Sequence, residues 1–519
     1  MTDDADKARD EPDGDREPAL RQAPATDRPE PLRGAPPDVR ELALDCLAMN
    51  SSADEAGRWF QKGLESMARS DRAGAISAFR RALQLHPGFA EAHSNLGLAL
   101  EGDGQLEEAE ACYHQALELN PGLTQTWVNL GALLAARKRH AEAEVAYRRA
   151  LALAPAHPSA LSNLGALLVE LKREAEAEQR YRTALAVAPE HRSASFNLGS
   201  LLLRQGRYEE GWRRLESRDG NSPLDGYLDG FRRWQGEPVE GKSLLIAAEG
   251  GHGDMIHFCR YAALLKQRGA SRVSVFCHPA LTRLLTRLRG VDEVLTSGSA
   301  PPAAGWDYWT LPLSLPHLLG TTLETIPAEL PYLTADPEKI AAWRSALGKP
   351  WPELGVGLVW KGSARFARDA DRSLPSVSVL DPLMETPGIR FFSLQKGGEE
   401  GGAAVLGAFP MVELGPRLSS FAETAGVIMN LDLVITVDTA VAHLTGALGK
   451  PCWVLLCDSR AEWRWLKERA DSPWYPGVFR LFRQKTSGDW RPVIDEVKTA
   501  LKEQAELHSS KLDIRADSN

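Results

Sequence analysis

The sequence predicts a helical repeat solenoid followed by an α/β region of two doubly wound domains. Two observations carry this prediction. A pattern with a period of 34 residues runs from about residue 56 to 225, and from Gly241 onward apolar, strand-like runs alternate with amphipathic helical segments. With 519 residues, the chain is too long for a single core and suits about three folded units.

Composition and charge argue against several classes of protein. The net charge of −9 gives no basic surface for a polyanion, so we expect no nucleic-acid partner. The six cysteines are scattered, without a CxxC pair or a histidine cluster at metal spacing, which indicates reduced thiols and no metal site. The N-terminus lacks an apolar signal core and no run of about 18 apolar residues occurs, so we expect a cytoplasmic protein without a transmembrane segment.

The ends of the chain differ from its interior. Residues 1–38 are rich in Pro, Asp, Glu and Arg and hold almost no large apolar side chains, so burial cannot offset the entropy lost on ordering. We therefore predict a disordered acidic tail there. The predicted divisions are 1–38 tail, 39–225 solenoid, 236–350 first α/β domain, 351–505 second α/β domain and 506–519 polar tail.

The repeat region should form five helix pairs, the last of them imperfect. A proline closes each of four successive units: Pro87, Pro121, Pro155 and Pro189. A glycine recurs in the first helix of three units, at Gly97, Gly131 and Gly165, where the missing side chain lets the paired helix approach closely. This period and pattern resemble tetratricopeptide repeats.

An asparagine also recurs, although asparagine is a mediocre residue for a helix interior. The four positions are Asn95, Asn129, Asn163 and Asn197. In tetratricopeptide repeats this position lies on the helix that lines the concave face, and a carboxamide matches both the amide and the carbonyl of an extended peptide. The alternative is a set of solvated polar residues. Protein O-linked N-acetylglucosamine transferases carry a similar asparagine ladder, which favours a groove for a polypeptide or another partner.

The region after Gly241 is predicted to contain two βαβ runs, joined near residues 338–353. The first has strands at 243–248, 272–277 and 291–295 and helices at 255–269 and 278–290. The second has strands at 355–360, 389–395 and 431–437 and helices at 378–388 and 421–430. Two such Rossmann-like domains facing a cleft are the layout of a GT-B glycosyltransferase.

The segment LVITVDTAVAHLTGALG, residues 433–449, marks a candidate ligand site. Asp438 and Thr439 follow a fully apolar strand, at the edge where parallel sheets bind ligands. Thr439 is placed to cap the next helix, whose free amides would form an anion site, while Asp438 accepts sugar or ribose hydroxyls beside His443. The alternative is an ordinary helix cap and a core histidine.

A glycine-rich turn, EGGHGD, follows the first predicted strand of the α/β region. Gly250, Gly251 and Gly253 permit backbone conformations that other residues avoid, and Asp254 begins the next helix. At the cleft mouth, Asp254 would take a proton from an acceptor hydroxyl. The alternative for Asp254 is a helix cap.

A basic loop follows the strand GVGLVW and carries Lys361, Arg365, Arg368 and Arg372. Positive charge there would stabilise a departing nucleotide diphosphate; otherwise the loop is simply solvated. Gln395 and Lys396, which end another strand, should also point to the cleft. The D-x-D triplet 369–371 is metal-binding only in a different fold, so we assign it no metal.

Several motifs resemble one family, the bacterial tetratricopeptide glycosyltransferases related to family 9, the ADP-heptose:lipopolysaccharide heptosyltransferases. They are EGGHGDMIHFCRY, GLVWKGS, FFSLQKG, DLVITVDTAVAHLTGALGKPCWVLL, EWRWL and SPWYPGVFRLFRQ, in order across about residues 205–500. The resemblance matches Asp254 to the base, Lys361 to a donor-phosphate lysine, and Asp438-Thr439-Ala440 with His443 to the donor segment. The glycine turn departs from the Q-G-L-G-D that is usual in the tandem-repeat relatives.

We therefore expect a metal-independent, inverting glycosyltransferase that needs no cofactor besides its nucleoside-diphosphate sugar. A single displacement requires one base and no covalent nucleophile. The repeats would recruit a protein or glycan acceptor, or a partner. Two alternatives stay open: a tetratricopeptide scaffold with a degenerate glycosyltransferase domain, and a two-domain epimerase acting on UDP-N-acetylglucosamine.

Overall fold

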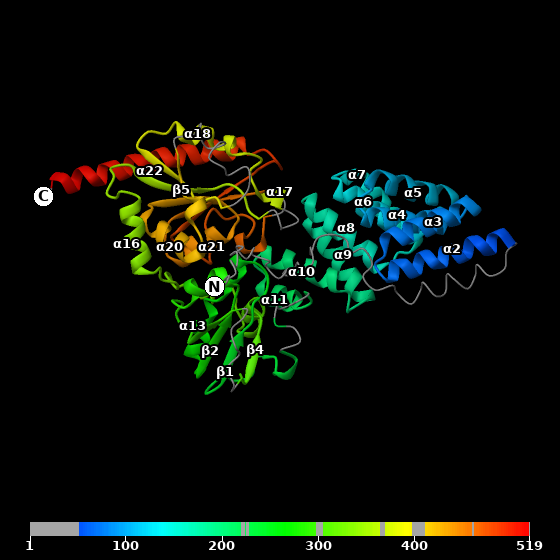
Figure 1. Ribbon diagram of the computed structural model, residues 1–519, viewed down its shortest axis with the longest axis horizontal. Helices are drawn as coiled ribbons and strands as arrows, with labels where there is room; N and C mark the ends of the chain where they lie inside the picture. Colours follow the sequence, from blue (N-terminus) through cyan, green and yellow to red (C-terminus); the bar gives the residue numbers. More distant parts are fainter. Residues whose placement is uncertain are drawn as a thin grey trace, which may run out of the picture.

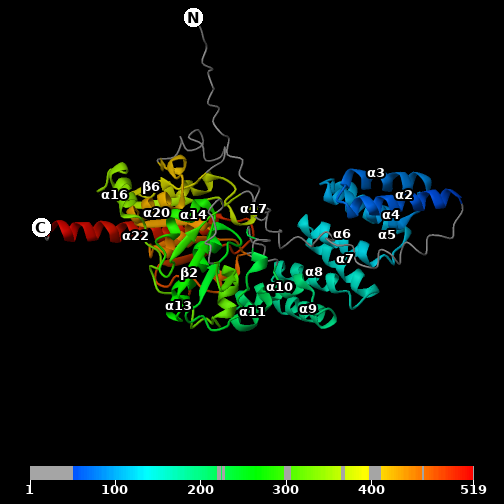
Figure 2. The same cartoon turned by 60° about the horizontal axis from the view of Figure 1, so that its bottom comes forward.

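The computed structural model describes residues 51–218, 224, 228–296, 305–363, 369–396, 411–458 and 461–517. The predicted tail at 1–38 lies outside these residues, and so do Arg365 and Arg368 of the basic loop. Figures 1 and 2 show a helical solenoid that runs away from one side of an α/β body.

The solenoid consists of five helix pairs in its described part. They are α2 (Ser51–Ala68) with α3 (Arg72–Leu85), α4 (Ala90–Gly102) with α5 (Leu106–Leu119), α6 (Thr124–Ala136) with α7 (His140–Leu153), α8 (Pro158–Glu170) with α9 (Glu174–Val187), and α10 (Arg192–Arg204) with α11 (Tyr208–Leu215).

The recurring glycines are the contact points within the pairs. A Cβ atom added to Gly131 would lie 2.6 Å from Cε1 of Tyr147, and one added to Gly165 would lie 2.6 Å from Cε1 of Tyr181. Both tyrosines are buried. The sequence pattern of a small residue opposite an aromatic ring therefore corresponds to direct packing of paired helices.

The first sheet of the α/β body is parallel, with strand order β3-β2-β1-β4. Its strands are β1 (Ser243–Ile246), β2 (Arg272–Phe276), β3 (Glu293–Leu295) and β4 (Tyr308–Thr310), and its helices include α12 (His252–Phe258), α13 (Tyr261–Gln267) and α14 (Pro279–Leu285). The single helix predicted at 255–269 is thus two helices. The side chain of Arg260 lies at the break and donates to the carbonyl of His257 at 2.8 Å.

The second sheet is also parallel, with order β10-β9-β8-β5-β6-β7. Its strands are β5 (Leu354–Val359), β6 (Ile389–Ser393), β7 (Met411–Glu413), β8 (Leu433–Val437), β9 (Cys452–Leu456) and β10 (Phe479–Arg483). Its longer helices are α16 (Pro337–Ala346), α20 (Phe421–Asn430), α21 (Ala440–Ala447) and α22 (Arg491–Asp517). Helix α22 continues to Asp517, where the sequence had predicted a polar tail from residue 506.

The hydrophobic cores do not follow the predicted domain divisions. Buried side chains of α2 to α10 form one cluster, which includes the tyrosines of the repeats. Leu203, Tyr208, Trp212 and Leu215, from the last helix pair, instead belong to the large core that spans both sheets. The end of the solenoid is therefore built into the α/β body.

Candidate functional site

Strand β8 is fully buried and delivers Asp438 and Thr439 to its carboxyl end. Thr439 occupies the N-cap position of α21, as predicted, but its side chain makes no capping hydrogen bond. Its hydroxyl instead lies 3.0 Å from the hydroxyl of Thr436. The first amides of α21 are therefore not satisfied by the Thr439 side chain.

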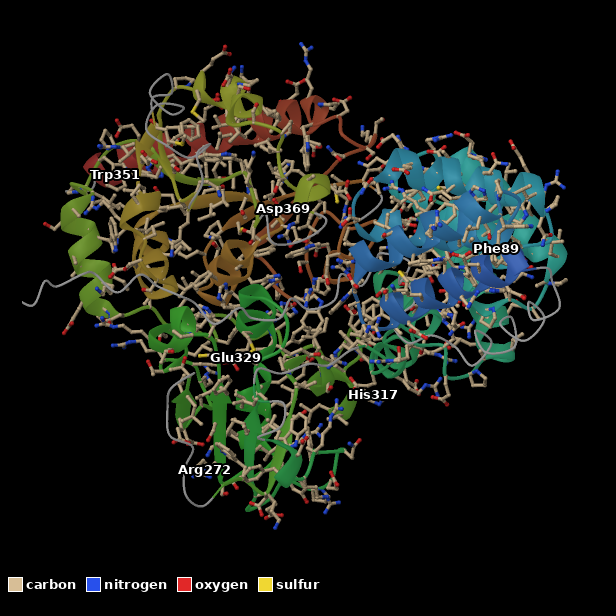
Figure 3. All side chains as sticks on the ribbon, turned by 45° about the vertical axis from the view of Figure 1, so that its right-hand side comes forward. Phe89, Arg272, His317, Glu329, Trp351 and Asp369 are labelled. Atoms are coloured by element: carbon tan, nitrogen blue, oxygen red, sulfur yellow. The ribbon has the colours of Figure 1, made fainter. Side chains whose placement is uncertain are left out.

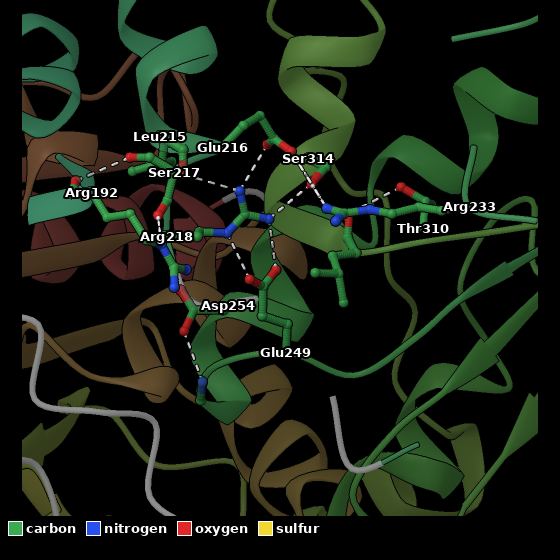
Figure 4. A network of polar contacts seen from close by, with 12 residues as sticks. Arg192, Leu215, Glu216, Ser217, Arg218, Arg233, Glu249, Asp254, Thr310 and Ser314 are labelled. Atoms are coloured by element: carbon green, nitrogen blue, oxygen red, sulfur yellow. Dashed lines mark hydrogen bonds and ion pairs between the residues drawn. The ribbon is translucent and has the colours of Figure 1, made fainter. Parts of the chain in front are cut away.

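The glycine turn after β1 is shaped by a left-handed glycine and by a hydrogen bond to Asp254. Gly250 has φ of +68°, a left-handed conformation that favours glycine. The amide of Gly251 donates to Oδ2 of Asp254 at 2.8 Å, so Asp254 does cap its own helix. Glu249, just before the turn, is buried and held by Arg218 from the end of the solenoid, at 2.6 and 3.0 Å (Figure 4).

The carboxyl ends of β1 and β8 meet, because α12 and α21 pack directly on one another. A Cβ atom on Gly253 would lie 3.0 Å from Cδ2 of His443 and 3.4 Å from Cα of Ala440. Arg464, which follows β9, contacts Oδ1 of Asp254 through Nη2 and Oε1 of Glu462 through Nη1, the latter at 2.5 Å. This guanidinium thus joins the two sheets at the candidate site.

The acidic groups of the site are electrostatically coupled. Desolvation raises the pKa of Asp438; the nearby carboxylate of Asp254 adds to the rise, whereas Arg372 and Arg464 oppose it. The pKa of Glu462 is likewise raised to about 7, mainly by desolvation. Arg464 opposes this rise, whereas the carboxylates of Asp438 and Asp254 add to it. Of the Glu462 side-chain surface, 36% stays exposed. Glu462 can therefore change its charge near neutral pH.

Two buried histidines share one hydroxyl. The Tyr475 hydroxyl lies 2.9 Å from Nδ1 of His257 and 2.9 Å from Nδ1 of His443. Burial lowers the pKa of both imidazoles well below the usual value, and nearby arginines add to the effect, so both are neutral. One hydroxyl carries one proton, so it donates to at most one of the two rings and accepts from at least one of them.

The tautomer of His257 can be assigned from its remaining ring nitrogen. Nε2 of His257 is buried and has no hydrogen-bond partner among the described residues. A buried acceptor left unpaired is better tolerated than an unpaired N–H, so His257 donates from Nδ1 to Tyr475. In His443, Nε2 lies next to the Cδ2 atom that faces the glycine turn.

The other predicted donor residues are placed differently. Gln395 is buried, and its side-chain oxygen accepts from the backbone amides of Trp360 and Lys361 at 3.2 and 3.0 Å, so it braces the loop after β5. Lys396 is exposed. Arg372 acts on Asp438 electrostatically and donates to Asp369 at 3.0 Å.

The carboxylates of the D-x-D triplet bind side chains of the protein, one in the same loop and one in the solenoid. Asp369, labelled in Figure 3 on the side of the body that faces the repeats, accepts from the Ser373 hydroxyl at 2.8 Å. Asp371 pairs with Lys138 of the solenoid at 3.1 Å. Within the described residues, no group of three His, Cys, Asp or Glu side chains is arranged to hold a metal ion.

All four repeated asparagines lie on the first helix of a pair and are half-buried. Nδ2 of Asn95 donates to the carbonyl of Glu91 at 2.8 Å, and Oδ1 of Asn129 accepts from Gln125 at 2.8 Å. In these two residues, one end of the amide is engaged within its own helix.

Arg464, Glu462 and Tyr475 were not predicted as site residues. They come from the irregular segment between β9 and β10, which has no period to place it. The only signal was the motif pair EWRWL and SPWY, in which charged residues are interleaved with large aromatic ones.

Comparisons with known proteins agree with this two-part architecture. Residues 90–123 and 122–190 match tetratricopeptide repeat families. Residues 382–463 match glycosyltransferase family 9 (heptosyltransferase), a segment that includes β8 and α21 but ends before Arg464. The chain joins tetratricopeptide repeats to a segment that matches glycosyltransferase family 9. That segment suggests a glycosyltransferase.

Protein FlbA of Caulobacter vibrioides is 29% identical over 337 residues. The alignment covers 58% of this chain and 53% of FlbA, so the chain spans about half the length of this curated relative.

Solved structures with similar parts include MamA (21% identity, 30% of this chain, 91% of that chain, TM-score 0.27). Another is Pseudomonas aeruginosa pilF (22% identity, 33% and 80% covered, TM-score 0.31). These scores are too low to support a conclusion about this protein. No helix in the described ranges combines the length and hydrophobicity that crossing a membrane requires.

Proposed function

We propose that the protein transfers a sugar from a nucleoside-diphosphate sugar to a hydroxyl acceptor where the two sheets meet, in a GT-B arrangement. The main support is the contact of α12 with α21, which brings the carboxylates of Asp254 and Asp438 and the ring of His443 to one place. The family 9 match covers the α21 side and supports donor binding there.

On the donor side, the amides at the start of α21 and the cations Lys361 and Arg372 would receive the diphosphate. Arg365, outside the described residues, belongs to the same proposal. Asp438 would accept hydroxyls of the ribose or sugar. His443 is neutral, so its Nε2 would act through a hydrogen bond rather than through a charge.

On the acceptor side, Asp254 would remove the hydroxyl proton as the oxygen attacks the anomeric carbon. The bond from that carbon to the diphosphate oxygen breaks on the opposite face, which inverts the configuration. Each carboxylate oxygen carries two lone pairs, so the bonds to Arg464 and Gly251 leave capacity for the proton. The step requires no metal, and the repeats, with their half-buried asparagines, would recruit the acceptor.

The contacts that Asp254 already makes also favour a second candidate function. In this alternative, the protein is a tetratricopeptide scaffold whose glycosyltransferase domain has lost its catalytic activity. Both oxygens of Asp254 already accept a hydrogen bond, one of them from Arg464. A purely structural role for Asp254 would explain both contacts.

The test is a thermal-unfolding panel of UDP-, GDP-, ADP- and CMP-linked sugars with the wild type, Asp438→Ala and the exposed control Asp103→Ala. A true donor at a hundredfold over its Kd should add about 2.7 kcal/mol to the free energy of unfolding of wild type and control. Asp438→Ala should lose this response. With the donor known, Asp254→Asn should abolish transfer while keeping donor binding. No response in wild type would support the scaffold instead.

A further inference from the structure

A cavity of about 220 Å³ lies between the solenoid and the segments that follow strands β9 and β10 of the second sheet. Its walls come from α8, α9 and α10 on one side and from the segments after β9 and β10 on the other. We call it the junction cavity, and its lining includes Glu174, Arg204, Asp458, Lys467, Arg483 and Gln484.

Positive charge is in excess in this lining, with four basic side chains against three acidic ones. Glu174 is engaged by Arg204 at 2.7 Å and by Lys467 at 3.6 Å. Asp458 is engaged by Lys172 at 2.9 Å. Two of the acidic groups are thus already paired with cations, and the third, Glu468, is exposed.

Arg483 carries the uncompensated charge. Nη2 donates to the carbonyl of Trp465 at 2.6 Å and Nε to the carbonyl of Arg469 at 3.3 Å, and no carboxylate in the described part of the chain contacts it. The pKa of Arg483 is lowered to about 10, mainly by burial; Cys457 opposes the change and Arg204 adds to it. A desolvated guanidinium without an anion beside it is unfavourable.

Gln484 adds an independent signal of a ligand. The residue is 4% exposed, and its Nε2 has no hydrogen-bond partner among the residues that the structure describes. A buried amide group with two protons and no acceptor is costly, and a bound acceptor would remove that cost.

We propose that the junction cavity binds a small anion whose phosphate or carboxylate group accepts from the Gln484 amide and neutralises Arg483. Because the cavity walls belong to both parts of the molecule, the anion would also fix the solenoid to residues 461–468, the segment that carries Glu462 and Arg464. This binding does not depend on the function proposed above.

The test titrates inorganic phosphate and, separately, succinate into the full chain and follows thermal unfolding against sodium chloride at equal ionic strength. The Tm of the wild type should rise saturably with phosphate, with succinate or with both. The anion that raises Tm shows whether the cavity takes a phosphate or a carboxylate group. Gln484→Leu and Arg483→Gln should each weaken the response at least tenfold. The exposed control Lys502→Met should respond as wild type does.

Gln484→Leu tests the anion site even if Arg483→Gln folds poorly. Leucine has nearly the same volume and no unpaired amide, so without anion this variant should unfold at the wild-type temperature or above. An absent or non-saturable response in wild type overturns the proposal. So does an unchanged response in Gln484→Leu, since phosphate would then be bound elsewhere, for example at α21.

Discussion

Arg464 is the side chain on which the candidate site depends. It is 5% exposed and contacts a carboxylate from each side, Asp254 from the first sheet and Glu462 from its own segment. Its guanidinium also lies 5.0 Å from the ring centroid of Phe258. Removing it would leave the carboxylates of Asp254 and Glu462 without the cation that both contact.

Glu462 should make stability depend on pH. Its pKa is raised from 4.5 to about 7 on folding, so the folded state holds a proton that the unfolded state has lost between these values. Its contribution to the free energy of unfolding therefore falls as pH rises from about 4.5 to about 7. Glu462→Gln should raise Tm relative to wild type more at pH 8 than at pH 5. The exposed control Glu496→Gln should show no such difference between the two pH values.

Tyr475→Phe should destabilise the protein by about 1–3 kcal/mol, because it leaves Nδ1 of two buried histidines without a partner. Urea unfolding measures this. Tyr147→Phe removes the same atom from a buried tyrosine whose hydroxyl makes no hydrogen bond within the described ranges, and it should cost clearly less. Equal losses in the two variants would contradict the shared-hydroxyl arrangement.

The sequence could locate only part of this site. Asp438, His443 and Asp254 belong to local sequence patterns, in which an apolar strand or a glycine turn is followed by a helix. Such patterns can be recognised without knowing the fold. The contact of Asp254 with Arg464 joins residues 210 positions apart. No local rule predicts it. The same holds for Gln395, which looked like a cleft residue because it ends a strand.

Among the helices, the turn that joins each pair contains one residue with a positive φ, although the residue type there varies. Ser70, Gly104, Lys138, Lys172 and Gly206 occupy equivalent positions and all have φ between 60° and 85°. The lysines at this position are strained by roughly 1–2 kcal/mol relative to glycine. Both reach the α/β body, where they pair with Asp371 and Asp458. The period predicted the helices, but it could not show that these turns face the second sheet.

The packing of paired helices gives a direct test. Gly131→Ala places a Cβ atom 2.6 Å from Cε1 of Tyr147, so the pair must separate, and we expect a loss of about 1–3 kcal/mol in urea unfolding. Gly57→Ala in α2 meets nothing within 4 Å, and alanine favours a helix, so this control should be neutral or stabilising. A tolerated Gly131→Ala would mean that the helices are not packed as closely as described.

For the protein as a whole, the solenoid is tied to the glycine turn by a buried ion pair. Arg218 and Glu249 are 9% and 7% exposed, and Arg218 also donates to Glu216 at 2.7 Å (Figure 4). Arg218→Met should cost about 3–5 kcal/mol because it leaves a buried carboxylate unpaired. Arg182→Met, which breaks the more exposed pair with Glu210, should cost about 0–1 kcal/mol. Thermal unfolding of both variants checks this, and similar Tm values would contradict it.

The aromatic contacts of the last helix pair distinguish its role from that of the others. The indole nitrogen of Trp212 donates to the carbonyl of Thr321 at 3.0 Å, and its ring lies 5.0 Å from that of Trp463. Each earlier pair touches mainly its neighbours, as in other repeat arrays. Repeat units at the free end of the array, before the turns at Lys138 and Lys172 that contact the α/β body, could therefore be added or removed without disturbing that junction, whereas α10 and α11 form the base of the array.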